Sequence, residues 1–343
     1  MSNPQSATHN PEGLEIFPKG TIQSHAPISP QFDVITFGEC MLRFSPPAGQ
    51  VLEQTDLFRV DPAGTESNMA VALARLGGAI SWFSVLPNTP LGHWITTRLD
   101  SHGVDVSHVI WTTDRVGVFF LEPGTPPRGS RVVYDRANAA ASFLATEMVD
   151  WTLFRNARIV HTTGITAALS ESCRTFVEEA LQQAGALGCR TSFDVNYRAK
   201  LWSTGEAADT LTPILHHVDI LISTMADIEL IFKIDGSPEQ MIQALSTRFN
   251  NEMIILTLAA GGAVGWSENT GFLYTGPKPV EQVDRLGAGD AFDAGLLFGI
   301  LQDDLKSGLD YGTALAALSY SEQGDVTWST LDEVQKLAGS VKT

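Results

Sequence analysis

Hydrophobic positions in this chain form short apolar runs that alternate with amphipathic stretches. The runs, rich in Val, Ile and Phe, lie at Asp33–Cys40, Ala79–Leu86, Arg158–Thr162, Thr191–Val195, Val218–Ser223 and Met253–Leu258. Helical spacing of apolar residues marks Ser67–Leu76, Ser172–Leu187 and Pro238–Phe249. Continuously apolar strands that alternate with helices are typical of a parallel sheet covered on both faces. The pattern therefore predicts an α/β fold with a mainly parallel central sheet.

Two regions break this rhythm, at 42–62 and 116–136, where strand-like alternation continues with no helix between the strands. Val116–Glu122 and Arg131–Tyr134 flank a turn-rich segment, Pro123–Gly129. We interpret these regions as a small antiparallel flap that projects from the main sheet. The flap is either an extra strand pair without function or a lid that keeps water out of a site.

The net charge limits the classes of binding partner, and the cysteine content bears on the cellular compartment. The net charge is −17, from 39 acidic and 22 basic residues, which argues against nucleic acid or an anionic membrane as a partner. A few local Arg residues can still bind an anionic substrate. Three cysteines without a CxxC pair predict neither a disulfide framework nor a zinc site, and favour a reducing, cytoplasmic setting.

The N-terminal segment and the lengths of the apolar runs bear on secretion and membrane insertion. Residues 1–32 are polar, Pro-rich and without the apolar core of a signal peptide, so we interpret them as a disordered leader. No apolar run approaches the roughly 20 residues that a membrane-spanning helix needs.

Candidate chemistry is concentrated in Gly287–Asp290 (GAGD), after which the pattern becomes helical through Leu301. Gly287 and Gly289 would open that helix and turn backbone N–H groups outward, which makes an anion hole. Asp290 at its mouth could accept the proton of an attacking hydroxyl. Taken alone, the motif fits a helix cap as well as a catalytic base. Neither GxxxxGK[ST] nor a GxGxxG after a strand occurs in the chain.

A second motif changes that balance. Ala63–Asn68 (AGTESN), followed by Ala70–Gly77 (AVALARLG), resembles the N-terminal signature of the ribokinase-like (PfkB) carbohydrate kinases, and Gly287–Asp290 resembles their C-terminal signature. The resemblance runs from about Asp33 to the end of the chain. It implies a kinase domain at 33–343 with a three-layer α/β/α fold, a mainly parallel central sheet and a small antiparallel β lid. It also implies ATP and Mg²⁺ as cofactors and a small-molecule sugar or sugar acid as substrate.

Within that family the chain is most similar to the 2-keto-3-deoxygluconate kinases. The resembling segments are Gly38–Arg43 (GECMLR), Val133–Ala137 (VYDRA), His161–Thr166 (HTTGIT), Phe193–Arg198 (FDVNYR) and Gly324–Asp325. The resemblance implies phosphorylation of the terminal hydroxyl, giving 2-keto-3-deoxy-6-phosphogluconate. Two alternatives remain open: a kinase for a neutral sugar such as fructose or ribose, or for a nucleoside; and a sugar-binding or regulatory homologue with impaired catalysis.

The resemblance assigns roles residue by residue. For catalysis it implies Asp290 as the base and Gly287, Ala288 and Gly289 as the anion hole. For the acceptor it implies Gly64, Asn68, Phe119, Tyr134, Arg136, Ile165, Arg198 and Asp325. Arg198 would bind the acceptor carboxylate, because the guanidinium fork matches both oxygens. Alternatively, Asn68 could cap its helix, and Arg136 or Arg198 could form a surface salt bridge.

On the nucleotide side the resemblance implies Asn196, Thr224, Asp227, Thr257, Ala259, Gly262, Gly287, Gly289 and Thr313, with Asp227 reaching Mg²⁺ through water. Three positions depart from the family pattern. Thr257 and Ala259 replace the Lys and first Gly of KxGxxG, and Thr224 replaces the Asn of NxxE. These departures concern nucleotide affinity and metal handling, and they motivate the impaired-catalysis alternative. Because lid strands of this family often pair between subunits, we also expect a homodimer or higher homo-oligomer.

Overall fold

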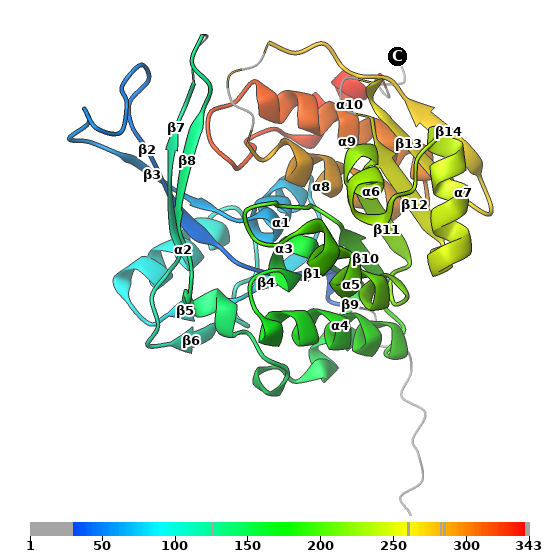
Figure 1. Cartoon of the computed structure of the whole chain (residues 1–343), viewed down its shortest axis with the longest axis horizontal. Coiled ribbons are helices and arrows are strands. Elements are labelled where there is room, and N and C mark those ends of the chain that lie inside the picture. Colours follow the sequence, from blue (N-terminus) through cyan, green and yellow to red (C-terminus); the bar gives the residue numbers. More distant parts are fainter. Residues whose placement is uncertain (1–29, 125–126, 259–260, 282, 284–285, 340–343) are drawn as a thin grey trace, which may run out of the picture.

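The computed structural model describes residues 30–124, 127–258, 261–281, 283 and 286–339. Its central sheet has eight strands in the order β14-β13-β12-β11-β10-β9-β1-β4 (Figure 1). Their bounds are β1 Phe32–Phe37, β4 Ile80–Phe83, β9 Ala157–Thr163, β10 Arg190–Asp194, β11 Ile220–Thr224, β12 Met253–Thr257, β13 Ala263–Ser267 and β14 Gly271–Thr275. Every pairing from β12 to β4 is parallel, and β13 and β14 add an antiparallel edge. The predicted mainly parallel sheet is confirmed.

Helices cover both faces because successive residues of the central strands point in opposite directions. Val34 and Ile255 belong to one hydrophobic core, whereas Ile35 and Ile254 belong to the other. The first core is closed by α1 Thr65–Arg75, α2 Pro90–Asp100, α8 Ala288–Ile300, α9 Leu305–Tyr320 and α10 Leu331–Ala338. The second is closed by α4 Glu171–Ala186, α5 Thr204–Leu215, α6 Met225–Phe232 and α7 Pro238–Phe249. The result is the predicted three-layer α/β/α arrangement.

The predicted strand Ala79–Leu86 is two strands in the structure. β4 ends at Phe83, and β5 (Val85–Pro87) leaves the main sheet to pair with β6 (Ile110–Thr112). The change occurs at Ser84, whose carbonyl accepts from the Ile110 N–H at 2.9 Å. The pattern also did not single out α2, α5, α6, α9 or α10 as helices, and Pro213 lies inside α5. Short helical turns complete the fold: α3 Gly164–Ala167 and 3-10 turns at Ala140–Phe143, Thr146–Met148 and Trp151–Asn156.

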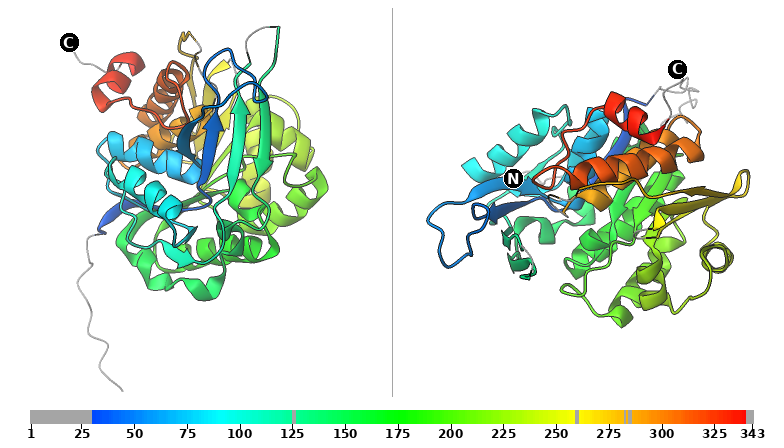
Figure 2. Two further views of the ribbon diagram at one scale, coloured as in Figure 1. Left: turned by 90° about the vertical axis from the view of Figure 1, so that its left-hand side faces the viewer. Right: turned by 90° about the horizontal axis from the view of Figure 1, so that it is seen from above.

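A second sheet forms the predicted lid and stands beside the body of the molecule (Figure 2). Its order is β3-β2-β7-β8, with bounds β2 Met41–Ser45, β3 Arg59–Ala63, β7 Val118–Glu122 and β8 Arg131–Asp135. The two outer pairings are antiparallel, as predicted, but β2 and β7 pair in parallel. The parallel pairing arises because the two strand pairs come from distant parts of the chain, which no turn connects.

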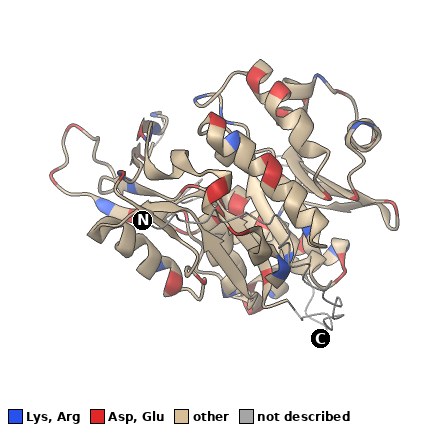
Figure 3. Cartoon of the chain, turned by 90° about the horizontal axis from the view of Figure 1, so that it is seen from below, with Lys and Arg blue, Asp and Glu red and all other residues tan. Residues whose placement is uncertain are grey.

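Other expectations concern charge, thiols and the termini. In the view of Figure 3, acidic positions lie on several helices and loops with basic positions among them. Cys40, Cys173 and Cys189 are buried free thiols. None of the helices within the described ranges is long and apolar enough to cross a membrane. Residues 1–29 of the predicted leader lie outside the described residues.

Candidate active site

A cavity of about 1130 Å³ lies between the lid and the carboxyl ends of the central strands. Parallel strands bring their carboxyl ends to one edge, so the loops that follow them meet there. The structure brings the four predicted catalytic residues and all eight predicted acceptor-binding residues to this cavity. Its lining also includes Asn196, Thr224 and Asp227 from the predicted nucleotide side.

The start of α8 has the geometry that the GAGD pattern predicted. Gly287 is the N-cap at φ +79°, and a Cβ there would lie 2.1 Å from the backbone oxygen of Asp325. Only glycine fits both constraints. A Cβ on Gly289 would meet no atom within 4 Å, so its backbone borders open space. The first N–H groups of α8, which have no partner within the helix, therefore lie at the edge of the cavity, where an anion could bind them.

Asp290, in the first turn of α8, is buried and its Oδ2 accepts from Asn68 Nδ2 at 2.7 Å. Burial raises the pKa of this carboxyl to about 6, while the Asn68 hydrogen bond and the charge of Arg198 oppose the rise. A carboxylate with that pKa is mostly ionised at neutral pH and still basic enough to accept a proton. The geometry thus suits Asp290 as a general base.

Asn68 links the base to the other signature motif. Gly64 is the N-cap of α1, and a Cβ there would lie 2.0 Å from the Glu39 backbone oxygen. Asn68 is in the second turn, so it does not cap the helix, and its amide bridges the Gly64 N–H at 3.4 Å and Asp290. The helix-cap alternative for Asn68 does not describe this structure.

Glu66, which the sequence reasoning missed, holds α1 against the opposite wall of the cavity. Its Oε1 accepts from the hydroxyls of Thr163 and Thr166 at 2.8 and 2.7 Å. Both threonines flank Ile165, a predicted acceptor residue at the start of α3. Burial raises the pKa of Glu66 to about 7. Its position within the N-terminal signature was the available signal.

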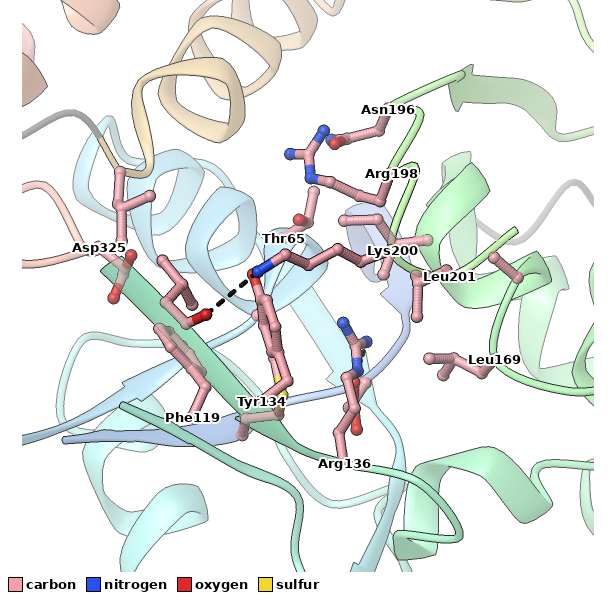
Figure 4. Close-up of a pocket in the computed structure, with 18 of the residues that line it drawn as sticks. Thr65, Phe119, Tyr134, Arg136, Leu169, Asn196, Arg198, Lys200, Leu201 and Asp325 are labelled. Atoms are coloured by element: carbon pink, nitrogen blue, oxygen red, sulfur yellow. Dashed lines mark hydrogen bonds and ion pairs between the residues drawn. The ribbon is translucent and has the colours of Figure 1, made fainter. Parts of the chain in front are cut away.

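Two arginines line the cavity, and they differ in their partners. Arg136 forms an ion pair with the buried carboxylate of Glu39. Arg198 forms no ion pair with any described residue, and its Nη1 donates only to the neighbouring Tyr197 carbonyl at 3.0 Å. Figure 4 shows the Arg198 guanidinium beside Asn196 at the cavity wall. Arg198 is therefore available to an anionic ligand, whereas the charge of Arg136 is already compensated.

Lid residues complete the acceptor side. The rings of Phe119 and Tyr134 lie 5.5 Å apart, on paired positions of β7 and β8. Asp325 forms a buried ion pair with Arg43 of β2 at 3.0 Å. Lys200 was not predicted; it lines the cavity, and its proximity in the sequence to Arg198 was the only signal.

The predicted nucleotide residues are more dispersed. The Thr224 hydroxyl caps α6 by accepting from the Asp227 N–H at 2.9 Å. Thr257, which pairs with Thr224 across β12 and β11, does not line the cavity, and neither does Gly262. Thr313 also lies outside the cavity lining, and its hydroxyl donates to the Leu309 carbonyl within α9 at 2.8 Å. Ala259 lies outside the described residues.

Two further acidic residues lie close together, Asp194 in the cavity lining and Asp293 buried behind it. Asn196, at φ +41°, donates from Nδ2 to Asp194 Oδ2 at 2.7 Å. Asp293 is buried one turn after Asp290, and its Oδ2 has no hydrogen-bond donor. Burial and the negative charges of Asp194 and Asp290 raise the pKa of Asp293 well above its usual range. The described residues contain no cluster of three or more His, Cys, Asp or Glu suited to a metal ion.

The sequence pattern that defines the pfkB family of carbohydrate kinases matches residues 31–331. The chain belongs to this family. A 2-dehydro-3-deoxygalactonokinase of Haloferax volcanii is 37% identical over 308 residues, covering 89% of this chain and 96% of the relative. A 2-dehydro-3-deoxygluconokinase of Bacillus subtilis is 33% identical, covering 86% of this chain and 92% of the relative.

A solved structure agrees with this family assignment. The crystal structure of 2-dehydro-3-deoxygluconokinase from Thermotoga maritima superposes on this carbohydrate kinase with a TM-score of 0.85 and 32% identity, covering 91% of this chain and 99% of that one. The predicted family and its ribokinase-like fold are confirmed. The individual residue assignments stay predictions, supported by the geometry above.

Proposed function

We propose that this kinase transfers the γ-phosphate of ATP to the terminal hydroxyl of 2-keto-3-deoxygluconate (2-dehydro-3-deoxygluconate), giving 2-keto-3-deoxy-6-phosphogluconate. The observation that carries the proposal is Arg198, whose guanidinium forms no ion pair with any described residue and lies in the same cavity as Asp290. A sugar acid supplies the matching carboxylate. The Bacillus and Thermotoga relatives named above act, by their names, on this acid.

The chemistry follows from the start of α8. The acceptor hydroxyl would lie against Asp290, which takes its proton as the oxygen attacks the γ-phosphorus; the bond from this phosphorus to the β,γ-bridging oxygen breaks and ADP leaves. The N–H groups of Gly287–Gly289 stabilise the charge that develops on the transferring phosphoryl group. Asn68 holds the Asp290 carboxylate at 2.7 Å, so the base keeps one orientation during the transfer.

The nucleotide side of the cavity suits a Mg²⁺ ion held by a single protein carboxylate. Mg²⁺ keeps several waters and takes few protein carboxylates alongside substrate phosphates. Asp227 is half-buried at the cavity, and burial raises the pKa of its carboxyl. We propose that Asp227 holds the ion through water, where the ion neutralises phosphate charge.

A second acceptor, 2-keto-3-deoxygalactonate, is favoured by the Haloferax relative, whose name specifies that acid. The two acids differ in configuration at one carbon and share the carboxylate and the terminal hydroxyl. Arg198 and Asp290 serve both acids equally. Discrimination between them therefore depends on contacts to the intermediate hydroxyls.

The test is a coupled ATP-turnover assay over both keto acids, fructose, ribose and a nucleoside. We expect one or both acids to give the highest kcat/KM. A neutral acceptor that is turned over better than either acid would contradict the proposal. Binding of sugar without turnover or nucleotide binding would instead support a catalytically impaired homologue.

Arg198→Ala tests the carboxylate assignment. Loss of a charged hydrogen-bonding partner raises the KM for the keto acid by roughly 10- to 100-fold, with a smaller effect on kcat. The control is Arg190→Ala, which removes a half-buried Arg paired with Glu252 outside the cavity. An equal loss for acid and neutral acceptors would show that Arg198 has a general structural role.

Assembly and compartment are further proposals. Leu57, Phe58 and Val133 expose apolar side chains on the lid, which supports a homodimer formed through this sheet. Sedimentation at assay concentration measures that state. The three free thiols support a reducing, cytoplasmic setting.

A further inference from the structure

Lys200 connects the body of the kinase to its lid. The residue follows Arg198 in the segment after β10, and its Nζ donates to the Val132 carbonyl of β8 at 3.1 Å. Figure 4 shows the side chain extending across the cavity to the lid strand. This hydrogen bond joins the segment after β10, which also contains Arg198, directly to the lid sheet.

The position of β8 gives this contact its significance. In the described part of the lid sheet, β8 is an edge strand that pairs only with β7. Edge strands have backbone groups without a strand partner, so their position relative to other elements is weakly defined. The ammonium of Lys200 supplies a donor to this edge and thereby fixes its distance from the body.

Tyr134 lies in the same contact. Lys200 Nζ is 5.2 Å from the centre of the Tyr134 ring, and Arg136 Cζ is 5.7 Å from it. Cations at such distances attract the electron-rich face of an aromatic ring. Arg136 is itself held by Glu39. The ring of Tyr134 is therefore placed by one cation from the lid and one from the body.

We propose that Lys200 is a positioning residue, which latches the lid edge to the body and places Tyr134 against the acceptor. The proposal rests on the proposed function only in taking the acceptor to be a sugar acid. The rival role is direct: Lys200 could bind the acceptor carboxylate together with Arg198. The two roles give opposite results with an acceptor that has no carboxylate.

Lys200→Met keeps the aliphatic stem and removes the ammonium. We expect the KM for the keto acid to rise roughly tenfold, with kcat and the KM for ATP nearly unchanged. Lys200→Arg should restore most of the affinity, because it can still donate to Val132 and lie against the ring. The matched control is Lys233→Met, since Lys233 also donates to a backbone carbonyl, at 2.7 Å on Leu230, but outside the cavity.

A double-mutant cycle separates latch from carboxylate ligand. If Lys200 acts through Tyr134, adding Lys200→Met to Tyr134→Leu costs little beyond Tyr134→Leu alone. The loss also persists when the acceptor is the amide of the keto acid. Additive effects, or a loss that disappears with the amide, would overturn the proposal.

Hydrogen exchange gives a readout that does not depend on the substrate. Without ligand, Lys200→Met should speed amide exchange in Arg131–Asp135 severalfold and leave β10 unchanged. Unchanged exchange in β8 would overturn the latch. If neither keto acid is phosphorylated by the unaltered kinase, the proposed function fails while this measurement still decides the role of Lys200.

Discussion

The proposed acceptor side and the proposed nucleotide side of the site are built in different ways. On the acceptor side, buried polar contacts join segments far apart in the chain, as in Asn68 to Asp290 and Arg43 to Asp325. On the nucleotide side, Thr224 and Thr313 use their hydroxyls locally, in a helix cap and within one helix. The acceptor side is preorganised by its side chains, whereas the nucleotide side relies on backbone geometry at α8.

This difference explains where the chain departs from its family. A buried pair cannot lose one member without leaving an unpaired polar group, which costs roughly 1–3 kcal/mol or more. A threonine that caps a helix can replace another capping residue at almost no cost. Thr224 therefore changes at a position where substitution is tolerated, and it does not by itself indicate lost catalysis.

The largest expected effect is on kcat, and it comes from replacing Asp290, which contacts Asn68 and lies in the first turn of α8. Asp290→Asn should lower kcat by about 10²–10⁴-fold, because the amide cannot accept the proton. Acceptor binding by calorimetry should be nearly unchanged, since the amide oxygen still accepts from Asn68. In the unaltered enzyme the rate should rise with pH through about 6, as Asp290 loses its proton.

The matched control for that variant is Asp332→Asn, at an exposed position in α10. It should retain full activity. A near-normal kcat in Asp290→Asn would contradict the assignment of the base and remove the basis for comparing the two halves.

The same comparison shows what the sequence could predict. Gly64, Asn68 and Gly287–Asp290 were found because they lie in local motifs whose backbone demands are visible in the residues. The strands were found because their apolar runs are continuous. The contacts of Lys200 and Glu66 and the proximity of Asp194 to Asp293 depend on which distant segments meet, and so does the parallel pairing of β2 with β7. Position inside the N-terminal signature or beside Arg198 could point to Glu66 and Lys200 themselves, but a single sequence does not show which distant residues they contact.

A second test concerns the buried acids behind the cavity. Asp293 has a folded-state pKa far above its unfolded value, so its folded form binds a proton that the unfolded chain releases. Stability due to this group is full below the unfolded pKa of about 4 and decreases as pH rises. Asp293→Asn should therefore match the unaltered enzyme near pH 4 and exceed it at pH 7, by up to about 1.4 kcal/mol per pH unit. Urea unfolding at both pH values measures this difference.

Asp304→Asn is the control with the opposite sign. Asp304 caps α9, and hydrogen bonds from Ser307 lower the pKa of its carboxyl. Its contribution is present above the unfolded pKa and is lost as pH falls, so the variant should be less stable than the unaltered enzyme at pH 7 only. A difference for Asp293→Asn that does not change with pH would mean that Asp293 is ionised in the folded kinase.

The smallest expected effect is on the KM for ATP, through a substitution on the nucleotide side. Thr224→Asn restores the residue of the family pattern, and Asn caps a helix as well as Thr does, so the stability should be unchanged. One added neutral hydrogen bond lowers the KM for ATP by roughly 2- to 10-fold. The KM for the keto acid should stay constant, because the acceptor contacts do not involve α6. A change in the acceptor KM instead would show that the two halves are coupled through Asp227 and Arg198, whose charges already interact.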